Sequence, residues 1–289
     1  MKLRAFPMRL FLLNVLRLIL NSYLKIKMQL VLSVFSGIDI LGKGFLENGF
    51  CVVSSGDIIT GQDIRKFNGV ENKFDGVIGG SPCQDFSKAR RTPSTGYGLA
   101  MINEFRRVVF ETKPRWFLLE NVPTVPNINC DGYKVQRFDL NALECGSIQN
   151  RHRHFQFGSV DGLILNVERD ARPQIKTRCV TASEGKQTGT QRRGFSEFCE
   201  LQGLPKDFDL SEFTQSGKYR AVGNGVNLFV ARRVACAILN ATENTDEKKL
   251  SFNQLCACGC GRILSGRQKT ASVACRKRLQ KKRGLILPF

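Results

Sequence analysis

Residues 79–87 read Gly79-Gly80-Ser81-Pro82-Cys83-Gln84-Asp85-Phe86-Ser87 and follow the short apolar run 74–78. The run is typical of a buried strand. A strand that reaches Gly-Gly-x-Pro ends abruptly, because proline has no N–H to donate to a sheet. Cys83 should then stand at the rim of a sheet, where open α/β folds place their ligands. A thiolate there would be a nucleophile, whereas most free cysteines are small buried hydrophobes.

Two later stretches carry charged side chains at the ends of similar runs. Residues 116–123 (Trp-Phe-Leu-Leu-Glu-Asn-Val-Pro) indicate a buried strand that ends at Glu120. A buried carboxylate destabilises the fold at this place unless it is paired with a cation or has a function. The plainer interpretation of Glu120 is a surface turn residue. Residues 149–153 (Gln-Asn-Arg-His-Arg) lead into a further strand-like run. Alternation along a strand puts Arg151 and Arg153 on one face.

Cys83, then Glu120, then the two arginines, each at a strand edge, resemble the DNA cytosine-5 methyltransferase family. The Pro-Cys-Gln, Glu-Asn-Val and Gln-x-Arg-x-Arg motifs of that family stand almost unaltered, and the resemblance spans roughly residues 28–240. It implies an α/β fold of the Rossmann-like S-adenosylmethionine-dependent type. The sheet would be mostly parallel and doubly wound, with a reduced second lobe and a small C-terminal appendage. The catalytic residues that it implies are Cys83, Glu120, Arg151 and Arg153.

The methyl donor is expected at the end of the first buried strand, residues 29–35. Gly37 lets the backbone approach a ligand, and the following helix offers free N–H groups. In the family this loop holds S-adenosyl-L-methionine, usually as Phe-x-Gly-x-Gly, and Asp39 stands at or beside the second glycine's place. Asp57 and Asp63 suit ribose and adenine contacts, or simply turns and caps. The cofactor-binding residues implied by the resemblance are Phe35, Ser36, Gly37, Ile38, Asp57, Asp63, Ile64, Pro82, Leu99, Asn224 and Val226.

The charge of the chain favours a polyanionic partner, since its 289 residues carry a formal net charge of +19. After Ser87 comes a polar, basic loop that closes over the target base in the family. The family's long recognition region is shortened here to residues 159–215, so that sequence choice is relaxed or delegated. The expected DNA-binding residues are Ser87, Lys88, Arg90, Arg91, Lys186, Arg192 and Arg193. The plainer interpretation of Lys88, Arg90 and Arg91 is simple solvated charge.

The two ends of the chain fall outside the resemblance. We expect residues 1–27, whose apolar run 10–20 is too short to span a membrane, to be a non-essential extension. Residues 28–158 should form the cofactor-binding and catalytic domain, 216–242 its C-terminal return, and 243–289 a linker and basic tail. Scattered cysteines, eleven in all, fit a reducing cytoplasm. Two alternatives remain for the tail: one zinc ion held by Cys256, Cys258, Cys260 and Cys275, or a basic arm that binds no metal.

The function implied by these residues is transfer of methyl from S-adenosyl-L-methionine to C5 of cytosine through a covalent Cys83–C6 adduct. Duplex DNA is the expected partner of a monomer that binds no membrane. Two alternatives remain: the same chemistry on transfer RNA, and a non-enzymatic DNA-binding accessory with an inactive transferase fold. The sequence does not give the recognition site, and a small basic enzyme of this type would suit a bacteriophage or a mobile element.

Overall fold

The computed structural model describes residues 28–87, 90, 92–187, 192–251 and 272–283, with side chains except at 244–251 and 279–283. The N-terminal extension 1–27 therefore lies outside the described residues. The strands are β1 (Leu30–Val34), β2 (Cys51–Ser55), β3 (Gly76–Gly80), β4 (Trp116–Asn121), β5 (Lys134–Asn141) and β6 (His152–Ser159). The α-helices are α2 (Ile40–Leu46), α3 (Tyr97–Thr112), α4 (Phe195–Leu201), α5 (Gln215–Asn224), α6 (Leu228–Ser251) and α7 (Val273–Arg283). Short 3₁₀ turns are η1 (Ile58–Thr60), η2 (Ile64–Lys66), η3 (Ala142–Cys145) and η4 (Glu184–Lys186).

One six-stranded sheet runs in the order β2-β1-β3-β4-β6-β5. The first four strands are parallel, and β6 alone is reversed, because it pairs antiparallel with both β4 and β5. The predicted mostly parallel α/β sheet is confirmed. The chain winds from β1 outward to β2 and then returns to β3 on the other side of β1. This reversal creates a crevice at the carboxyl ends of β1 and β3, where such sheets bind ligands.

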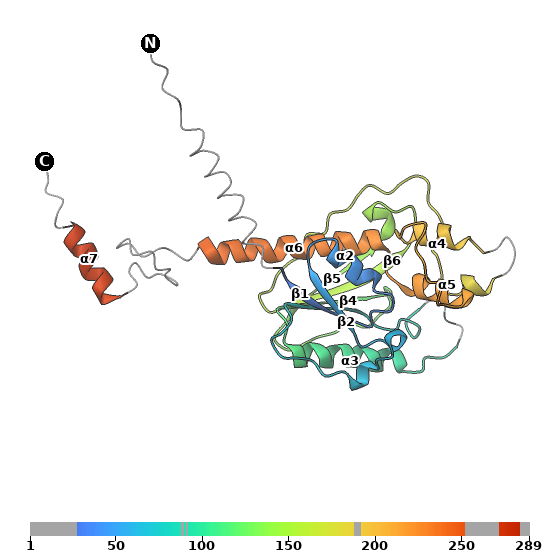
Figure 1. Cartoon of the computed structure of the whole chain (residues 1–289), viewed down its shortest axis with the longest axis horizontal. Helices are drawn as coiled ribbons and strands as arrows, with labels where there is room; N and C mark the ends of the chain where they lie inside the picture. Colours follow the sequence, from blue (N-terminus) through green and yellow to red (C-terminus); the bar gives the residue numbers. More distant parts are fainter. Residues whose placement is uncertain (1–27, 88–89, 91, 188–191, 252–271, 284–289) are drawn as a thin grey trace, which may run out of the picture.

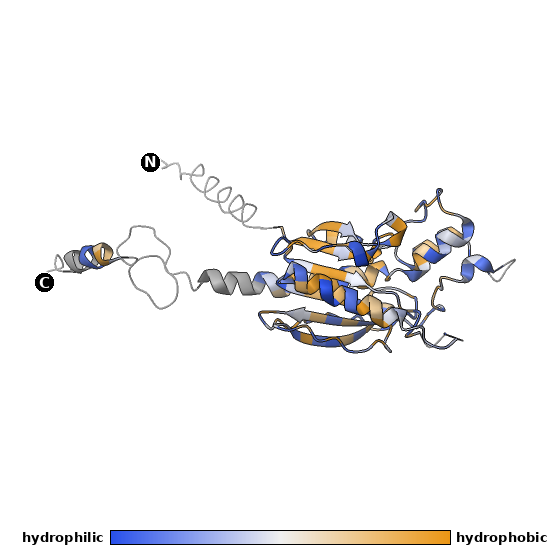
Figure 2. Cartoon of the chain, turned by 90° about the horizontal axis from the view of Figure 1, so that it is seen from below, coloured by the Kyte–Doolittle hydropathy of each residue, from blue (hydrophilic) through white to orange (hydrophobic). Residues whose placement is uncertain are grey.

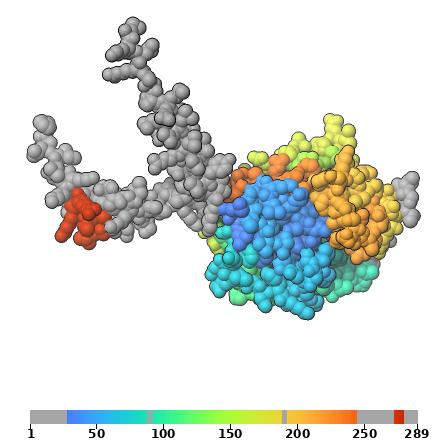
Figure 3. All heavy atoms as spheres, in the orientation of Figure 1, coloured from blue at the N-terminus to red at the C-terminus, as the bar shows by residue number. Residues whose placement is uncertain are grey.

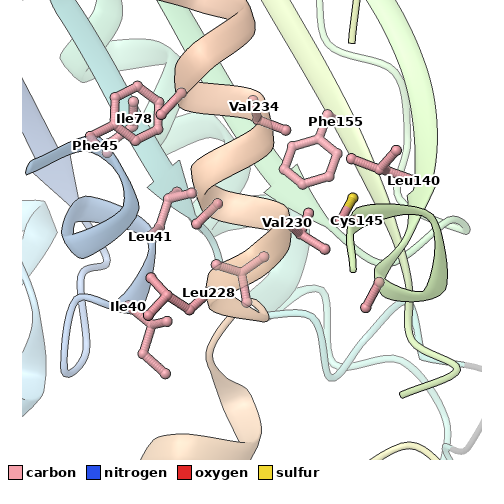
Figure 4. Packing of buried hydrophobic residues seen from close by; sticks show 14 of the residues in the cluster. Ile40, Leu41, Phe45, Ile78, Leu140, Cys145, Phe155, Leu228, Val230 and Val234 are labelled. Carbon is pink, nitrogen blue, oxygen red and sulfur yellow. The ribbon is translucent and has the colours of Figure 1, made fainter. Parts of the chain in front are cut away.

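Helices cover both faces of the sheet (Figure 1). Alternate residues of each strand face opposite layers, so Val31, Ile78 and Leu118 pack toward α2 and α6, while neighbouring residues pack toward α3. Figure 4 shows Val230 and Val234 of α6 close to Phe155 of β6, while Leu41 of α2 packs on the other side of α6. Each fully buried side chain of this size contributes about 1.5–3 kcal/mol. Coloured by hydropathy, several strands are orange, and the helix in front of them carries both blue and orange residues (Figure 2).

Trp116 fixes how closely β3 and β4 approach. Its ring is fully buried, stacks on Phe45 at 6.0 Å between centroids, and donates from Nε1 to Gln29 Oε1 at 3.1 Å. A Cβ at Gly76 would lie 2.3 Å from the indole. Gly76 is therefore the residue that lets the strand leading to Cys83 pass over the tryptophan.

One expectation about the C-terminal part of the chain needs correction. Residues 241–247 were expected to be a polar linker, with a boundary at 243, but α6 continues unbroken through them to Ser251. Residues 241–251 contain no proline or glycine, and their Ala, Glu, Lys and Leu residues favour helix. Within the described part of the chain one stretch, Gln215–Glu243, is long and apolar enough to cross a membrane by length and composition, yet 61% of its apolar window is buried inside the protein. Burial of that kind is typical of a core helix.

The segment after β6 is tied to the far edge of the sheet instead of standing free as a base-reading element. Gln136 of β5 exchanges two hydrogen bonds with the backbone of Leu165 (2.7 and 3.0 Å). Arg169 and Arg172 both pair with Glu144, at 3.2 and 2.8 Å. Residues 195–225, yellow to orange in Figure 3, lie directly beside the blue N-terminal part of the fold and share its hydrophobic core through Phe198 and Tyr219. The second lobe is thus reduced to α4, α5 and the turns around them.

Candidate active site

A cavity of about 840 Å³ opens at the carboxyl ends of β1 to β4. Residues 33–41 line it from β1 and the start of α2, residues 56–59 from the end of β2, and residues 80–85 from the end of β3. Glu120 and Arg153 line it from β4 and β6, and α5 closes the remaining side. Its size suits a ligand site, for which about 300–1,000 Å³ is usual.

Cys83 lies in this cavity on a turn that neighbouring residues hold in place. Asn121, the last residue of β4, donates from Nδ2 to both the carbonyl and the hydroxyl oxygen of Ser81 at 3.0 Å. The N–H of Phe86 donates to Cys83 O at 3.0 Å. Burial raises the pKa of the Cys83 thiol, and the Glu120 charge raises it further. Cys83 is therefore a thiol at neutral pH, and it needs a base or a bound substrate to become a nucleophile.

Glu120 and Arg153 form a buried ion pair beside it. Arg153 Nε lies 2.9 Å from Glu120 Oε1, with side chains 14% and 10% exposed. Burial raises the pKa of Glu120, and the charges of Arg153 and Arg151 oppose that rise. A Cβ at Gly80 would lie 2.9 Å from Glu120 Oε2, so the glycine leaves room for the carboxyl group. The arrangement can present a protonated carboxyl to a bound ring nitrogen.

Arg151 does not join this group. Its guanidinium is buried and donates to the carbonyl oxygens of Val180, Gly223 and Gly225 at 3.1, 2.9 and 2.7 Å. The residue does not line the cavity. Alternation at the strand start predicted two arginines with a shared role, but Arg151 precedes β6 and reaches the loop after α5. It acts on Glu120 only through its charge, and its contacts hold α5 against the sheet.

The donor end of the cavity has an unusual backbone. Phe35, Gly37 and Asp39 all have positive φ, at 52°, 57° and 53°. Asp57 accepts a hydrogen bond from Gly37 N at 2.8 Å and another from Ile59 N at 2.8 Å. The hydroxyl of Ser36 is buried with no partner among the described residues. A loop bent in this way, with an unpaired hydroxyl in it, suits a polar ligand.

Asp39 explains how the chain manages without the second glycine. Aspartate is among the few residues that adopt the left-handed conformation at modest cost. Its carboxylate caps α2 by accepting from Gly42 N at 2.9 Å, and it also accepts from the hydroxyls of Ser33, at 2.8 Å, and Ser54. The same carboxylate thus joins β1, β2 and α2 at the rim of the cavity. The sequence showed the substitution but not this role.

The family can be settled once this geometry is set beside known proteins. The family described as C-5 cytosine-specific DNA methylase matches residues 45–189, half of the chain. That range contains Cys83, Glu120 and both arginines.

The chain belongs to the C-5 cytosine-specific DNA methylase family.

Curated relatives of this methylase are type II methyltransferases of bacteria. M.XorII of Xanthomonas oryzae pv. oryzae is 28% identical over 174 residues, which cover 46% of the chain and 41% of the relative. M1.HphI of Haemophilus parahaemolyticus is 38% identical over 106 residues, covering 31% and 28%. The chain therefore spans well under half the length of these relatives.

Solved structures share the fold of the methylase at low sequence identity. The Entamoeba histolytica methyltransferase EhMeth has a TM-score of 0.55 at 12% identity, and the match covers 74% of the chain and 98% of that protein. The S. pombe Dnmt2 methyltransferase has a TM-score of 0.55 at 13% identity, covering 75% and 99%. These likenesses confirm the fold class that the sequence predicted.

Most of the expected cofactor residues of the methylase line the cavity, and one does not. Phe35, Ser36, Gly37, Ile38, Asp57, Asp63, Ile64, Pro82, Asn224 and Val226 are all in its lining. Leu99 is half exposed on α3 and outside it, whereas Tyr97, Gly98 and Met101 line the cavity. Successive helical residues are about 100° apart, so Leu99 faces away when Gly98 and Met101 face inward. Asp63 also pairs with Arg65 at 2.6 Å and caps η2.

The DNA-contact residues expected in the methylase divide into three groups. Lys88 and Arg91 lie outside the described residues. Arg90 is folded back onto Asp85 and the Pro93 carbonyl, and Arg193 forms a largely buried pair with Glu184 at 3.1 Å. Both hold loops together, so they are not free for phosphates. Ser87 is half-buried beside the Cys83 turn, while Lys186 is exposed and Arg192 lies over the Tyr219 ring at 6.0 Å.

Several residues of the site were missed in the sequence. Asn121 positions the Cys83 turn, and Asp85 anchors the following loop through Thr95 and Gly98. Asn121 directly follows Glu120, and that adjacency was the available signal. Arg220 of α5 also lines the cavity. It stands four residues before Asn224, a helical spacing that places both on one face.

Most of the predicted zinc site lies outside the described residues. Cys256, Cys258 and Cys260 lie outside the described residues, and Cys275 is buried in α7. In the described part of the chain no group of three or more histidine, cysteine or acidic residues could hold a metal ion.

Proposed function

We propose that this methylase transfers a methyl group from S-adenosyl-L-methionine to C5 of cytosine in DNA. The observation that carries the proposal is the convergence of Cys83, Glu120 and Arg153 on the cavity that the Gly37 loop also lines. These groups come from three strands and lie far apart in the chain. If each of these residues had only a structural role, there would be no reason for all three side chains to line the same cavity.

The residues at the donor end fit S-adenosyl-L-methionine. Each oxygen of Asp57 accepts one backbone hydrogen bond and keeps a lone pair for a ribose hydroxyl. Ile58, Ile59 and Ile64 offer apolar surface for a purine, and the unpaired Ser36 hydroxyl offers a further polar contact. When bound, S-adenosyl-L-methionine supplies an electrophilic methyl group.

Cys83 makes C5 of cytosine reactive. Cytosine C5 is a poor nucleophile, but addition of the Cys83 sulfur to C6 would turn C5 into an enamine carbon able to take the methyl group. The proton on C5 would then leave to solvent, and elimination of Cys83 would release 5-methylcytosine. The target base must first leave the stack, at a cost of a few kcal/mol.

Glu120 and Arg153 stabilise the charge that develops in the ring. Because burial raises the pKa of Glu120, its carboxyl group is suited to donate a proton or hydrogen bond to N3 while Cys83 attacks. Arg153 holds Glu120 in place through the 2.9 Å contact. Asn121 orients the Cys83 turn through Ser81.

The decisive experiment is transfer of tritium from labelled S-adenosyl-L-methionine to duplex DNA and, in parallel, to transfer RNA. We expect labelled DNA with the wild type and none with Cys83→Ser. Duplexes that carry 5-fluorocytosine should give a denaturation-resistant complex with the wild type only, because fluorine at C5 cannot leave as a proton. Transfer by Cys83→Ser would contradict the mechanism. Label in RNA alone would move the substrate to RNA, and donor binding without any transfer would favour an inactive accessory.

We also propose that Cys256, Cys258, Cys260 and Cys275 hold one zinc ion in the basic tail, in a monomer that acts in the cytoplasm. Thiolates at these positions would stabilise a segment too short for its own core. Elemental analysis should find about one zinc per chain. Cys258→Ser should lose it, whereas Cys236→Ser, at an exposed cysteine of α6, should keep it. Absence of zinc from the wild type would refute the site.

A further inference from the structure

Arg220 is the charged residue of the cavity that the proposed chemistry leaves without a role. It lies on α5 and is exposed, and it lines the cavity together with Gly217, Ala221 and Asn224. Positions 217, 220, 221 and 224 share one face of a helix. The opposite face, with Tyr219 and Val222, is buried in the core. The helix is therefore fixed by packing on one side and presents Arg220 to the cavity on the other.

The carboxylates that line the cavity are already engaged. Asp63 pairs with Arg65 at 2.6 Å, and Asp85 pairs with Arg90. Asp39 and Asp57 accept from backbone N–H groups, and Glu120 pairs with Arg153. Among the described residues Arg220 alone of the charged lining side chains has no hydrogen bond or ion pair. Because the Arg220 guanidinium is not paired with any of these carboxylates, it is available to bind an anionic group of a ligand.

We infer that Arg220 binds an anionic oxygen group of one of the two substrates at the mouth of the cavity. A guanidinium can hold a phosphate or a carboxylate through two parallel N–H donors. Two sources have this chemistry: a backbone phosphate beside the extruded base, and the carboxylate of the methyl donor. The exposure of Arg220 favours the phosphate, because a polymer enters from the solvent side whereas the donor's loop lies at the ends of β1 and β2. The inference rests on the proposed function, which brings both substrates to this cavity.

Arg220→Ala and Arg220→Lys test the inference, and Lys218→Ala is the matched control. Lys218 stands two residues away on α5, lies over the Phe195 ring at 5.5 Å, and does not line the cavity. For a phosphate contact, Arg220→Ala should weaken DNA binding about tenfold and lower the slope of log affinity against log salt by about one. Arg220→Lys should restore part of the affinity, and Lys218→Ala should match the wild type.

The donor arm of the experiment identifies the other source. If the Kd values for S-adenosyl-L-methionine and S-adenosylhomocysteine rise in Arg220→Ala while DNA affinity does not change, the anion is the donor's carboxylate. If neither affinity changes by more than twofold, or if Lys218→Ala changes them equally, the inference is wrong. These are binding measurements, so they remain decisive even if the wild type transfers no methyl group, a result that would count against the proposed function alone.

Discussion

Arg153 Nε and Glu120 Oε1 lie 2.9 Å apart at the junction of β4 and β6, where both side chains are nearly buried. The register of the sheet pairs Glu120 with Gly80 on one side and Phe155 on the other. Because Arg153 stands two residues before Phe155 on β6, on the same face of the strand, its guanidinium can reach Glu120 at the strand end. The pair is thus placed by strand pairing.

Arg153→Ala should remove most of the transferase activity. Without its cation, the buried Glu120 carboxylate would be left unpaired and its orientation would be lost. We expect kcat to fall by about 10²–10⁴, as for loss of an acid–base group. Single-turnover transfer of tritium measures the chemical step. Arg153→Lys should recover part of it, and a variant with wild-type kcat would contradict the role assigned to the pair.

Glu120 should make the stability of the protein depend on pH. Burial raises its pKa above the ordinary value of 4.5, so the folded state binds a proton more tightly than the unfolded state. The stability gained from that proton is fully present below about pH 4.5 and is lost as pH rises through the raised pKa. Urea unfolding of the wild type and Glu120→Gln across pH 4–8 measures this contribution. The wild type should lose stability relative to Glu120→Gln as pH increases, and parallel profiles would contradict the raised pKa.

Arg151→Ala should act on folding first. Its guanidinium satisfies three buried carbonyl oxygens on the segments around Val180 and after α5. Removal leaves these acceptors unsatisfied, at a cost of at least about 3 kcal/mol in the free energy of unfolding. Arg153→Ala has no such set of carbonyl contacts and should cost less stability while costing more activity. If urea unfolding ranks the two variants in the opposite order, the structural role of Arg151 is wrong.

The sheet and the convergence of Cys83, Glu120 and Arg153 could be predicted because both depend on local patterns. Apolar runs that end in glycine, proline or a charge mark the carboxyl ends of parallel strands, and those ends meet at one edge. Arg151 could not be separated from Arg153 in this way. The difference depends on carbonyl groups about 30 and 70 residues further along the chain, which no local pattern reveals.

The basic residues show the same limit. Arg90 and Arg193 look like free surface charge in the sequence, but Asp85 and Glu184 occupy them once the chain folds. No sequence pattern marks Arg220 as a site residue, because it stands in a helix and belongs to no charge cluster. The folded state decides which cations stay available, since pairing depends on contacts between distant segments.

Asp57 should control affinity for the methyl donor without affecting DNA. Its carboxylate holds Gly37 N at 2.8 Å and Ile59 N at 2.8 Å and faces the cavity. In Asp57→Asn one oxygen becomes an N–H₂ group, which cannot accept both a backbone N–H and a ribose hydroxyl. We expect the KM for S-adenosyl-L-methionine to rise about tenfold, equivalent to about 1.4 kcal/mol, with kcat and the KM for DNA near wild type. Asp57→Glu keeps the acceptors and should change the KM much less. Equal effects of the two variants, or a change in DNA affinity of the same size, would place the role of Asp57 in folding of the Gly37 loop instead.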